Sequence, residues 1–221
     1  MRIVHALDDI LGNRNHLRVL RHLTLFPSAV ITGRGVAREL GMSHVSCIRS
    51  LNALVEVGAL TRKMIGTSST YEIPPDSILF SEILRPMFLR EAGLLDGLVK
   101  CLLRGGKSKV LAIYLFGSIA RGEDKPSSDV DILIILKRGV RKREFEEELN
   151  TNRYDIYRLY RVAVNVITYS YDECRRKKQQ RLPLIEEIIS EGKLLWGKKP
   201  ENWSRSTGRG EHPKQTLNAS R

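Results

Sequence analysis

The chain has 221 residues, of which 42% are hydrophobic and 28% charged, and its formal net charge is +12. This composition is that of an ordinary soluble protein, and the length fits one large or two modest domains. No apolar run approaches the roughly 20 residues that span a bilayer, and the N-terminus lacks the layout of a signal peptide. We therefore expect a cytoplasmic protein with no membrane partner. The positive charge favours contact with nucleic acid.

The first 75 residues have the pattern of a winged helix-turn-helix domain. Apolar spacing and turn residues predict helices over 13–25, 33–40 and 44–57, then a hairpin of strands 60–65 and 70–73 around 66–69. Thr32 and Ser43 directly precede the second and third helices, where a hydroxyl caps the first turn. The order of elements resembles bacterial and archaeal winged-helix regulators, which implies DNA binding. The alternative is a helical domain used for dimerisation or packing.

The third helix and the hairpin supply the residues that we expect to contact DNA. The face of helix 44–57 opposite its apolar stripe carries short polar or small groups and one arginine, which suits the major groove. Two basic residues of the hairpin are placed to touch phosphates. The predicted DNA-binding residues are Ser43, His44, Ser46, Arg49, Ser50, Arg62 and Lys63.

A helical connector is predicted over residues 76–106. Its apolar residues recur at helical spacing, but Pro86 and Gly93 argue against one straight helix, so we expect two parts. Its apolar stripe is also a candidate seam for a homodimer. Gly105 and Gly106 form the hinge into the next domain.

The rest of the chain alternates strand and helix patterns. The predicted elements are strands 110–116, 130–136, 162–168 and 193–196, and helices 143–158, 171–179 and 183–190. Tyr154, Tyr157 and Tyr160 recur every three residues, which favours packing onto the sheet; base stacking and modification are the alternatives. Residues 198–221 are polar and basic with few large apolar groups, which predicts a disordered tail.

The most informative segment runs from residue 110 to residue 136. An apolar strand leads into Gly117 and Ser118, and a second apolar strand carries Asp129 and Asp131. Residues two apart on a strand point to the same face, so the two carboxylates should project side by side. Carboxylates that close repel unless a cation lies between them. Beside a glycine turn that can approach phosphates, the expected cation is Mg²⁺ carrying a nucleoside triphosphate.

The motif Gly-Ser-x-Ala-Arg-Gly-x₅-Ser-Asp-x-Asp, from Gly117 to Asp131, resembles the minimal nucleotidyltransferases of the DNA polymerase β superfamily. The resemblance covers about residues 107–197 and implies an α+β chain whose C-terminal domain has a mixed sheet. It implies that ATP or another triphosphate is bound at Gly117, Ser118, Arg121 and Ser128, and Mg²⁺ at Asp129 and Asp131. Arg121 also has Glu123 and Asp124 within reach as ion-pair partners.

In that family a third acidic residue on a later strand completes the metal site, but strand 162–168 contains none. Asn165 is the residue there that resembles aspartate in shape, so it joins Asp129 and Asp131 as a candidate catalytic residue. Two hypotheses follow. The first is a Mg²⁺-dependent nucleotidyltransferase acting on a hydroxyl, which the resemblance extends to the antitoxin of a toxin–antitoxin pair with a partner toxin. The second is a DNA-binding regulator whose nucleotidyltransferase-like domain senses nucleotide without turnover.

Overall fold

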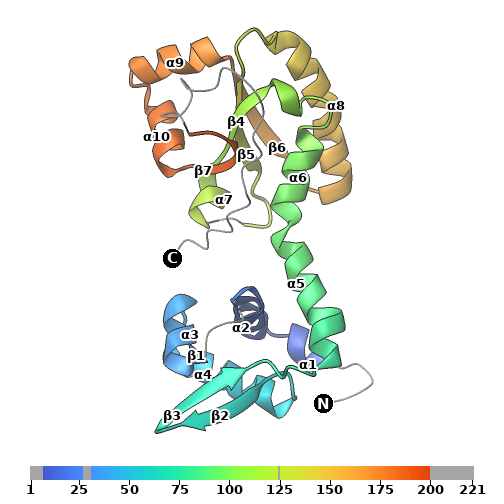
Figure 1. The fold of residues 1–221 in the computed structure, drawn as a ribbon, viewed down its shortest axis with the longest axis vertical. Helices are drawn as coiled ribbons and strands as arrows, with labels where there is room; N and C mark the ends of the chain where they lie inside the picture. The colour runs from blue at the N-terminus through green and yellow to red at the C-terminus, as the bar shows by residue number, and fades with distance from the viewer. Residues whose placement is uncertain (1–6, 27–30, 124, 200–221) are drawn as a thin grey trace. The chain divides into compact units, whose positions relative to one another are not determined.

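A computed structural model describes residues 7–26, 31–123 and 125–199 of the chain. The predicted tail lies almost wholly outside the described residues. The chain forms two compact units, which divide between Leu94 and Leu95 and are described separately below. Figure 1 labels their helices and strands. Within the described ranges, no helix has both the length and the apolar character that a membrane span requires.

The first unit contains short helices and one small sheet. Its elements are α1 (Asp8–Leu11), α2 (Arg14–Leu25), β1 (Ile31–Thr32), α3 (Gly33–Glu39), α4 (His44–Glu56), β2 (Thr61–Ile65), β3 (Ser68–Glu72), the π-helix η1 (Leu79–Leu84) and α5 (Arg85–Ala92). The expected N-caps are confirmed, because the side chains of Thr32 and Ser43 each accept a hydrogen bond from the backbone N–H three residues later. Asn13 caps α2 in the same way, although no cap was predicted there. The three predicted helices are therefore present, with ends shifted by one residue at most.

The sheet of the first unit differs from the prediction in two ways. The strand β1 was not predicted, and it pairs with β3 to give the order β1-β3-β2. Ser68 and Ser69 were assigned to the turn, but they pair with Ile65 and Met64 in the hairpin. The turn is therefore tighter than expected, with Gly66 at a positive φ of 61°, a conformation that glycine adopts without a Cβ penalty.

The predicted connector is divided between the two units. Leu79, Leu84 and Phe88 are buried in the core of the first unit, and Leu98 and Leu102 in the second. The helical region has three segments rather than two: η1, α5 and α6 (Leu94–Leu102). Pro86 lies in the first turn of α5, at the point where the π-helix η1 changes to an α-helix.

The second unit is built on a four-stranded mixed sheet with the order β6-β5-β4-β7. Its further elements are the 3₁₀ turn η2 (Lys107–Lys109), β4 (Val110–Phe116), α7 (Gly117–Arg121), β5 (Val130–Leu136), α8 (Lys142–Tyr160), β6 (Val164–Tyr169), α9 (Tyr171–Gln179), α10 (Pro183–Glu191) and β7 (Lys193–Gly197). β4 is antiparallel to both of its neighbours, whereas β5 and β6 are parallel. The expected mixed sheet is confirmed.

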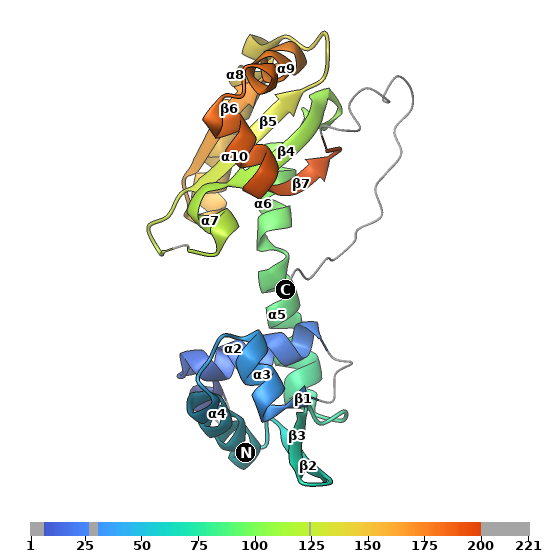
Figure 2. The same ribbon diagram turned by 90° about the vertical axis from the view of Figure 1, so that its left-hand side faces the viewer.

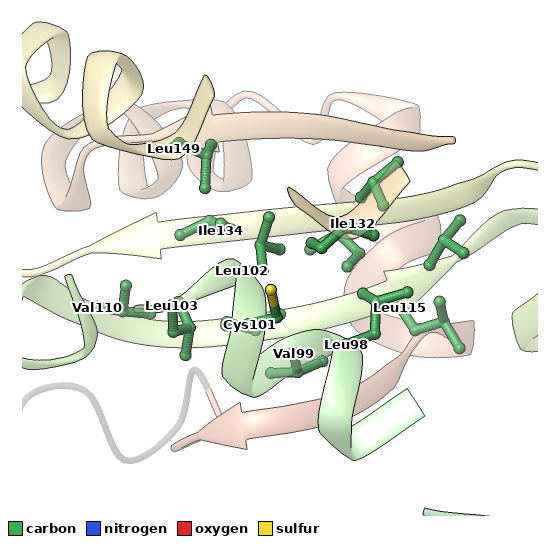
Figure 3. Close-up of a cluster of buried hydrophobic side chains, with 14 of the residues drawn as sticks. Leu98, Val99, Cys101, Leu102, Leu103, Val110, Leu115, Ile132, Ile134 and Leu149 are labelled. Atoms are coloured by element: carbon green, nitrogen blue, oxygen red, sulfur yellow. The ribbon is translucent and has the colours of Figure 1, made fainter. Parts of the chain in front are cut away.

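Helices cover both faces of this sheet, as Figure 2 shows. On one face α6 and α8 pack against alternate residues of β5, among them Ile132 and Ile134 (Figure 3). On the other face α9 and α10 pack against Leu133 and Ile135. Both faces of β5 are thus buried, which explains why its sequence is a continuous apolar run rather than an alternating one.

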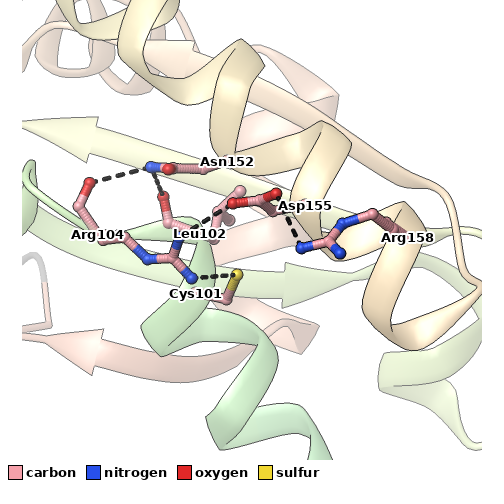
Figure 4. A network of polar contacts seen from close by, with 6 residues as sticks. All are labelled: Cys101, Leu102, Arg104, Asn152, Asp155 and Arg158. Atoms are coloured by element: carbon pink, nitrogen blue, oxygen red, sulfur yellow. Dashed lines mark hydrogen bonds and ion pairs between the residues drawn. The ribbon is translucent and has the colours of Figure 1, made fainter.

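A polar network fixes the end of α6 against α8 (Figure 4). The buried amide of Asn152 donates to the carbonyl oxygens of Leu102 and Arg104, both at 3.0 Å. These carbonyls lie at the end of α6 and just beyond it, where backbone acceptors have no intrahelical partner. Asp155 accepts from Arg104 at 2.9 Å and lies 3.7 Å from Arg158. The network holds α8, and hence the segment leading into β6, at a fixed position on the sheet.

Candidate active site

The two aspartates of the motif lie where β5 begins. Asp131 is the second residue of β5, and Asp129 directly precedes the strand. In the sheet Asp131 pairs with Phe116, the last residue of β4, on one side and with Asn165 of β6 on the other. Three strands therefore bring Gly117, the aspartates and Asn165 to one end of the sheet, the end at which Figure 1 shows α7.

Asn165 bridges the two carboxylates. Its Nδ2 donates to Oδ2 of Asp129 at 3.1 Å and to Oδ1 of Asp131 at 3.2 Å. An amide N–H₂ has two hydrogens, so one group satisfies both acceptors and offsets part of their mutual repulsion. The structure thus brings together the three candidate catalytic residues, and Asn165 occupies the strand position where the resemblance implies a third carboxylate.

Gly117 is in close contact with Asp131. The backbone of Gly117 has a φ of 73°, in the left-handed region. A Cβ built at this position would overlap Oδ2 of Asp131 and lie 3.2 Å from its Cγ. Both the conformation and the space therefore require glycine here, because any side chain would displace the carboxylate. This contact explains why the glycine and the second aspartate occur together in the motif.

Two other candidate nucleotide-binding residues, Ser118 and Arg121, lie on α7. Ser118 is half-buried in the first turn of α7. Arg121 donates to Glu123 at 2.9 Å and lies 3.9 Å from Glu187; the hydrogen bond to Glu123 raises the pKa of its guanidinium. The sequence left two roles open for Arg121, phosphate binding and an ion pair with a neighbouring acidic residue. The structure shows the ion pair.

Ser128 has a local structural contact. Its hydroxyl accepts a hydrogen bond from the backbone N–H of Lys125 at 2.9 Å, and its own N–H donates to the carbonyl of Lys125 at 2.9 Å. These bonds close the turn that leads into Asp129. The observed role of Ser128 is therefore to hold the chain that presents the first aspartate.

The site is open to solvent and chemically suited to a hard cation. Asp129 and Asn165 are exposed, and Asp131 is half-buried. Carboxylate oxygens that share one donor can hold Mg²⁺, which keeps several waters or phosphate oxygens as its other ligands. In the part of the chain that the structure describes, no group of three His, Cys, Asp or Glu side chains gathers in a metal-binding cluster. The residues therefore fit a magnesium–nucleotide complex but not an all-protein metal cage.

The residues predicted to contact DNA are mostly exposed in the first unit. His44, Arg49 and Arg62 are exposed, and the hydroxyl of Ser43 is used as the cap of α4, with Ser46 in its first turn. The prediction that Ser50 contacts DNA was wrong, because this residue is only 4% exposed and faces the core. Lys63 is also less available than expected, since it forms an ion pair with Glu72 across the hairpin.

Two of the three tyrosines on α8 also require a correction. They were expected to pack onto the sheet, yet Tyr154 is 70% and Tyr157 57% exposed, and Tyr160 alone is partly buried in the core. The prediction from the three-residue spacing was wrong for Tyr154 and Tyr157, because the buried side of α8 is formed by Phe145, Leu149 and Ile156. The arginines interleaved with the tyrosines were the available signal for a solvent-facing side.

The sheet, its two helical layers and the glycine–aspartate site all lie in the second unit. Residues 95–195 match the nucleotidyltransferase domain family. The match begins where the second unit begins, so α6, which we had assigned to the connector, falls within the range of the nucleotidyltransferase domain.

Solved structures also resemble part of the chain. A toxin-antitoxin crystal structure with AMP-PNP is 24% identical over 49% of this chain and 78% of that chain, with a TM-score of 0.37. A mutant of the toxin-antitoxin MntA-HpeT is 21% identical over 48% of this chain and 76% of that chain, with a TM-score of 0.35. Similarity at this level does not transfer a function. No curated protein matches the sequence.

Proposed function

We propose that the nucleotidyltransferase domain binds Mg²⁺ with ATP or another nucleoside triphosphate and transfers the nucleoside monophosphate to an acceptor hydroxyl. One observation carries this proposal: the carboxylates of Asp129 and Asp131 meet at a single amide, directly beside the glycine turn at residue 117. The motif and the match to the nucleotidyltransferase domain family support the same reading.

Asp129 and Asp131 would hold the cation. When bound, Mg²⁺ would neutralise charge on the phosphates and favour loss of the acceptor proton. Asn165 is neutral, so its contribution depends on which end of the amide faces the site. Nδ2 faces the carboxylates now; rotation of the amide would present Oδ1, an oxygen that Mg²⁺ accepts as a ligand. This site has one negative charge fewer than one with three carboxylates, and we expect weaker metal binding.

The reaction forms one bond and breaks one. The acceptor oxygen bonds to the α-phosphorus, the bond from the α-phosphorus to the β-phosphate oxygen breaks, and pyrophosphate leaves while the hydroxyl proton passes to solvent. Gly117 would allow the backbone to approach the departing phosphates, and Ser118 follows it in the first turn of α7. Arg121 would contribute a positive charge only by giving up its ion pair with Glu123.

Labelled ATP and Mg²⁺ in cell extract test the proposal. Wild-type protein should transfer label to an acceptor, and the variant Asp129→Ala/Asp131→Ala should not. A variant with unchanged labelling would contradict the assignment of these residues. Arg143→Ala is a suitable control, because this exposed arginine of α8 pairs with Glu147 at the surface.

Asn165 also favours a second candidate function, a nucleotide sensor without turnover. A neutral bridge between two carboxylates supports binding of one metal–nucleotide complex more readily than activation of a hydroxyl. The two functions separate in one comparison. A sensor binds ATP with Mg²⁺, loses this binding in Asp129→Ala/Asp131→Ala, and labels nothing in extract.

We propose further that the first unit binds DNA as a winged helix. The helix pair α3–α4, the hairpin β2–β3 and the exposed Arg49 and Arg62 support this proposal. Arg49→Ala and Arg62→Ala should each weaken binding to promoter DNA and flatten its salt dependence. Lys63→Ala should have a smaller effect, since Lys63 already pairs with Glu72. Equal and negligible effects of all three changes would remove DNA binding from the account.

The resemblance of the motif supports one more proposal, that the protein acts in the cytoplasm as the antitoxin of a partner toxin. Minimal nucleotidyltransferases that resemble this one commonly have that role, and some adenylylate their partner. Co-expression with the product of the neighbouring reading frame tests it: the full chain should relieve toxicity, and Asp129→Ala/Asp131→Ala should fail to do so if the relief depends on transfer.

A further inference from the structure

The C-terminal half of α8 carries a solvent-facing patch of aromatic and basic side chains. We define the α8 patch as Arg153, Tyr154, Tyr157 and Arg161. Residues three or four apart on a helix are neighbours on one face, which places Tyr157 beside Arg153 and Tyr154. Arg161 directly follows the last residue of the helix. All four are exposed, the tyrosines by 70% and 57% of their surface. More than half of the surface of each tyrosine is therefore open to solvent.

The patch is positive and its charges are uncompensated. Within the described part of the chain, Arg153 and Arg161 form no ion pair, whereas Arg158 on the neighbouring side of the helix is paired with Asp155. Asp155 also pairs with Arg104, which follows α6 (Figure 4). A partner that stacks on tyrosine and carries negative charge therefore complements this surface.

Arg161 holds an unfavourable backbone conformation. It ends α8 with a φ of 55°, in the left-handed region where helices usually place glycine. Only one other non-glycine residue of the described chain has a positive φ, Arg181. An arginine kept where glycine is easier is consistent with a role for its side chain, and the two arginines make a matched pair for testing that role.

The patch lies beside the candidate active site. Only three residues separate Arg161 from Asn165, so their Cα atoms are at most about 14 Å apart. The segment between them runs along the start of β5, where Val130 donates to the carbonyl of Ala163 at 2.9 Å. Figure 1 shows the C-terminal end of α8 at the same end of the sheet as α7. In the chain α8 leads directly into β6, the edge strand of the sheet.

This arrangement defines a side from which an acceptor can approach. Asp131 has the glycine turn after β4 on one side and Asn165 of β6 on the other. In phosphoryl and nucleotidyl transfer the attacking oxygen and the leaving group lie roughly in line. With the leaving phosphates at Gly117, the acceptor hydroxyl would come from the β6 side, and β6 is the strand into which α8 leads.

We propose that the α8 patch binds the end of a single-stranded nucleic acid, whose terminal hydroxyl is the acceptor of the transfer. The tyrosines stack on bases, and Arg153 and Arg161 contact phosphates, as aromatic and arginine side chains do in other single-strand-binding surfaces. The net charge of +12 supports this class of partner. The inference rests on the proposed transferase function for the acceptor role, but not for the binding surface. The terminal hydroxyl oxygen bonds to the α-phosphorus, pyrophosphate leaves, and the hydroxyl proton is lost to solvent.

The experiment uses full-length protein with short RNA and DNA oligonucleotides, each with either a free 3′ hydroxyl or a 3′ phosphate. Arg49→Ala/Arg62→Ala is present throughout to suppress binding by the first unit. Fluorescence anisotropy measures binding, and labelled ATP with Mg²⁺ measures transfer. Tyr154→Ala/Tyr157→Ala should weaken binding at least about tenfold, the change expected when stacked bases lose their platform. The RNA and DNA arms identify which strand is preferred.

Arg161→Gly and Arg181→Gly form the matched control. Both changes place glycine at a left-handed position and should leave the melting temperature unchanged or higher. We expect only Arg161→Gly to weaken oligonucleotide binding and transfer. Equal effects of the two changes would contradict a role for the Arg161 side chain.

The remaining outcomes separate the inference from the proposed function. Transfer to a protein in extract, unaffected by the α8 changes and absent with every oligonucleotide, would overturn the inference and leave the transferase assignment standing. Oligonucleotide binding that depends on the α8 patch, with no transfer to any acceptor, would refute the transferase function and keep the binding surface. Transfer to oligonucleotides with a free 3′ hydroxyl, but not to those with a 3′ phosphate, would support both the transferase function and the nucleic-acid acceptor.

Discussion

At the scale of single residues, the candidate site depends on which atoms occupy a small space at the start of β5. Gly117 has no Cβ, so Oδ2 of Asp131 can lie against its backbone. Asn165 then links Asp131 to Asp129 through one amide. Each residue constrains the next, so a change at any of them should alter the carboxylate pair.

Gly117→Ala should be considerably more harmful than Gly122→Ala. Both glycines have nearly the same positive φ, 73° and 74°, but a Cβ at 122 meets nothing within 4 Å. The backbone penalty alone should cost Gly122→Ala about 1 kcal/mol. Overlap with Asp131 should raise the cost of Gly117→Ala to about 2–4 kcal/mol. Denaturant unfolding measures both, and equal losses would contradict the contact.

Asn165→Asp should strengthen the metal site. A third carboxylate beside two others attracts Mg²⁺, so we expect the Mg²⁺ concentration needed for nucleotide binding to fall about tenfold. Without metal the added charge would repel both Asp129 and Asp131. Because Asn165 is exposed, each repulsion should cost about 1 kcal/mol, the value for two charges about 4 Å apart in water, so the two together should cost about 2 kcal/mol. Asn165→Ser, which adds no charge, is the control. Unchanged Mg²⁺ dependence in both variants would show that this position does not face the cation.

At the scale of elements, the sequence predicts best where one physical signal dominates. β4 and β5 have the predicted bounds because each is an unbroken apolar run between polar turns. β1 was missed because it has only two residues, and Thr32 was assigned to the cap that it also forms. Ser50 was placed on the wrong side of α4, since a small hydroxyl residue gives no clear signal of burial.

The cap of α9 gives an element-scale prediction about pH. Glu173 accepts a hydrogen bond from the backbone N–H of Ser170 at 2.8 Å, and this bond lowers the pKa of its carboxyl below the usual 4.5. The ionised carboxylate therefore stabilises the folded state above pH 4.5, and this contribution is lost as the pH falls through the lowered pKa. Glu173→Gln should be about 0.5–1 kcal/mol less stable at pH 7 and lose less on acidification.

Asp172→Asn is the control for that experiment. Asp172 lies in the same first turn of α9 and shares its helix dipole, but it is exposed and makes no capping bond. Thermal unfolding between pH 3 and pH 7 separates the two variants. A loss of acid sensitivity in Asp172→Asn as large as in Glu173→Gln would assign the effect to the dipole rather than the capping box.

At the scale of the whole molecule, two compact units with separate cores share one chain. Spacing along a strand predicted that Asp129 and Asp131 share a face, and the resemblance to nucleotidyltransferases indicated that strand 162–168 lacks a third carboxylate. The sequence could not show that Asn165 bridges the aspartates, since β6 must pair in parallel with β5 in one register for that contact. The sequence also could not predict that Tyr154 and Tyr157 are exposed to solvent, because helical spacing alone does not identify the buried side of α8.

The central claim is that Asp129 and Asp131 form a site for a magnesium-bound nucleoside triphosphate. Calorimetric titration of the full chain with an ATP analogue that cannot be cleaved between the α- and β-phosphates tests it most directly. We expect saturable binding that requires Mg²⁺ and is lost in Asp129→Asn/Asp131→Asn, a change that keeps shape and removes charge. Binding that is absent in the wild type, or equal in the variant, would contradict it.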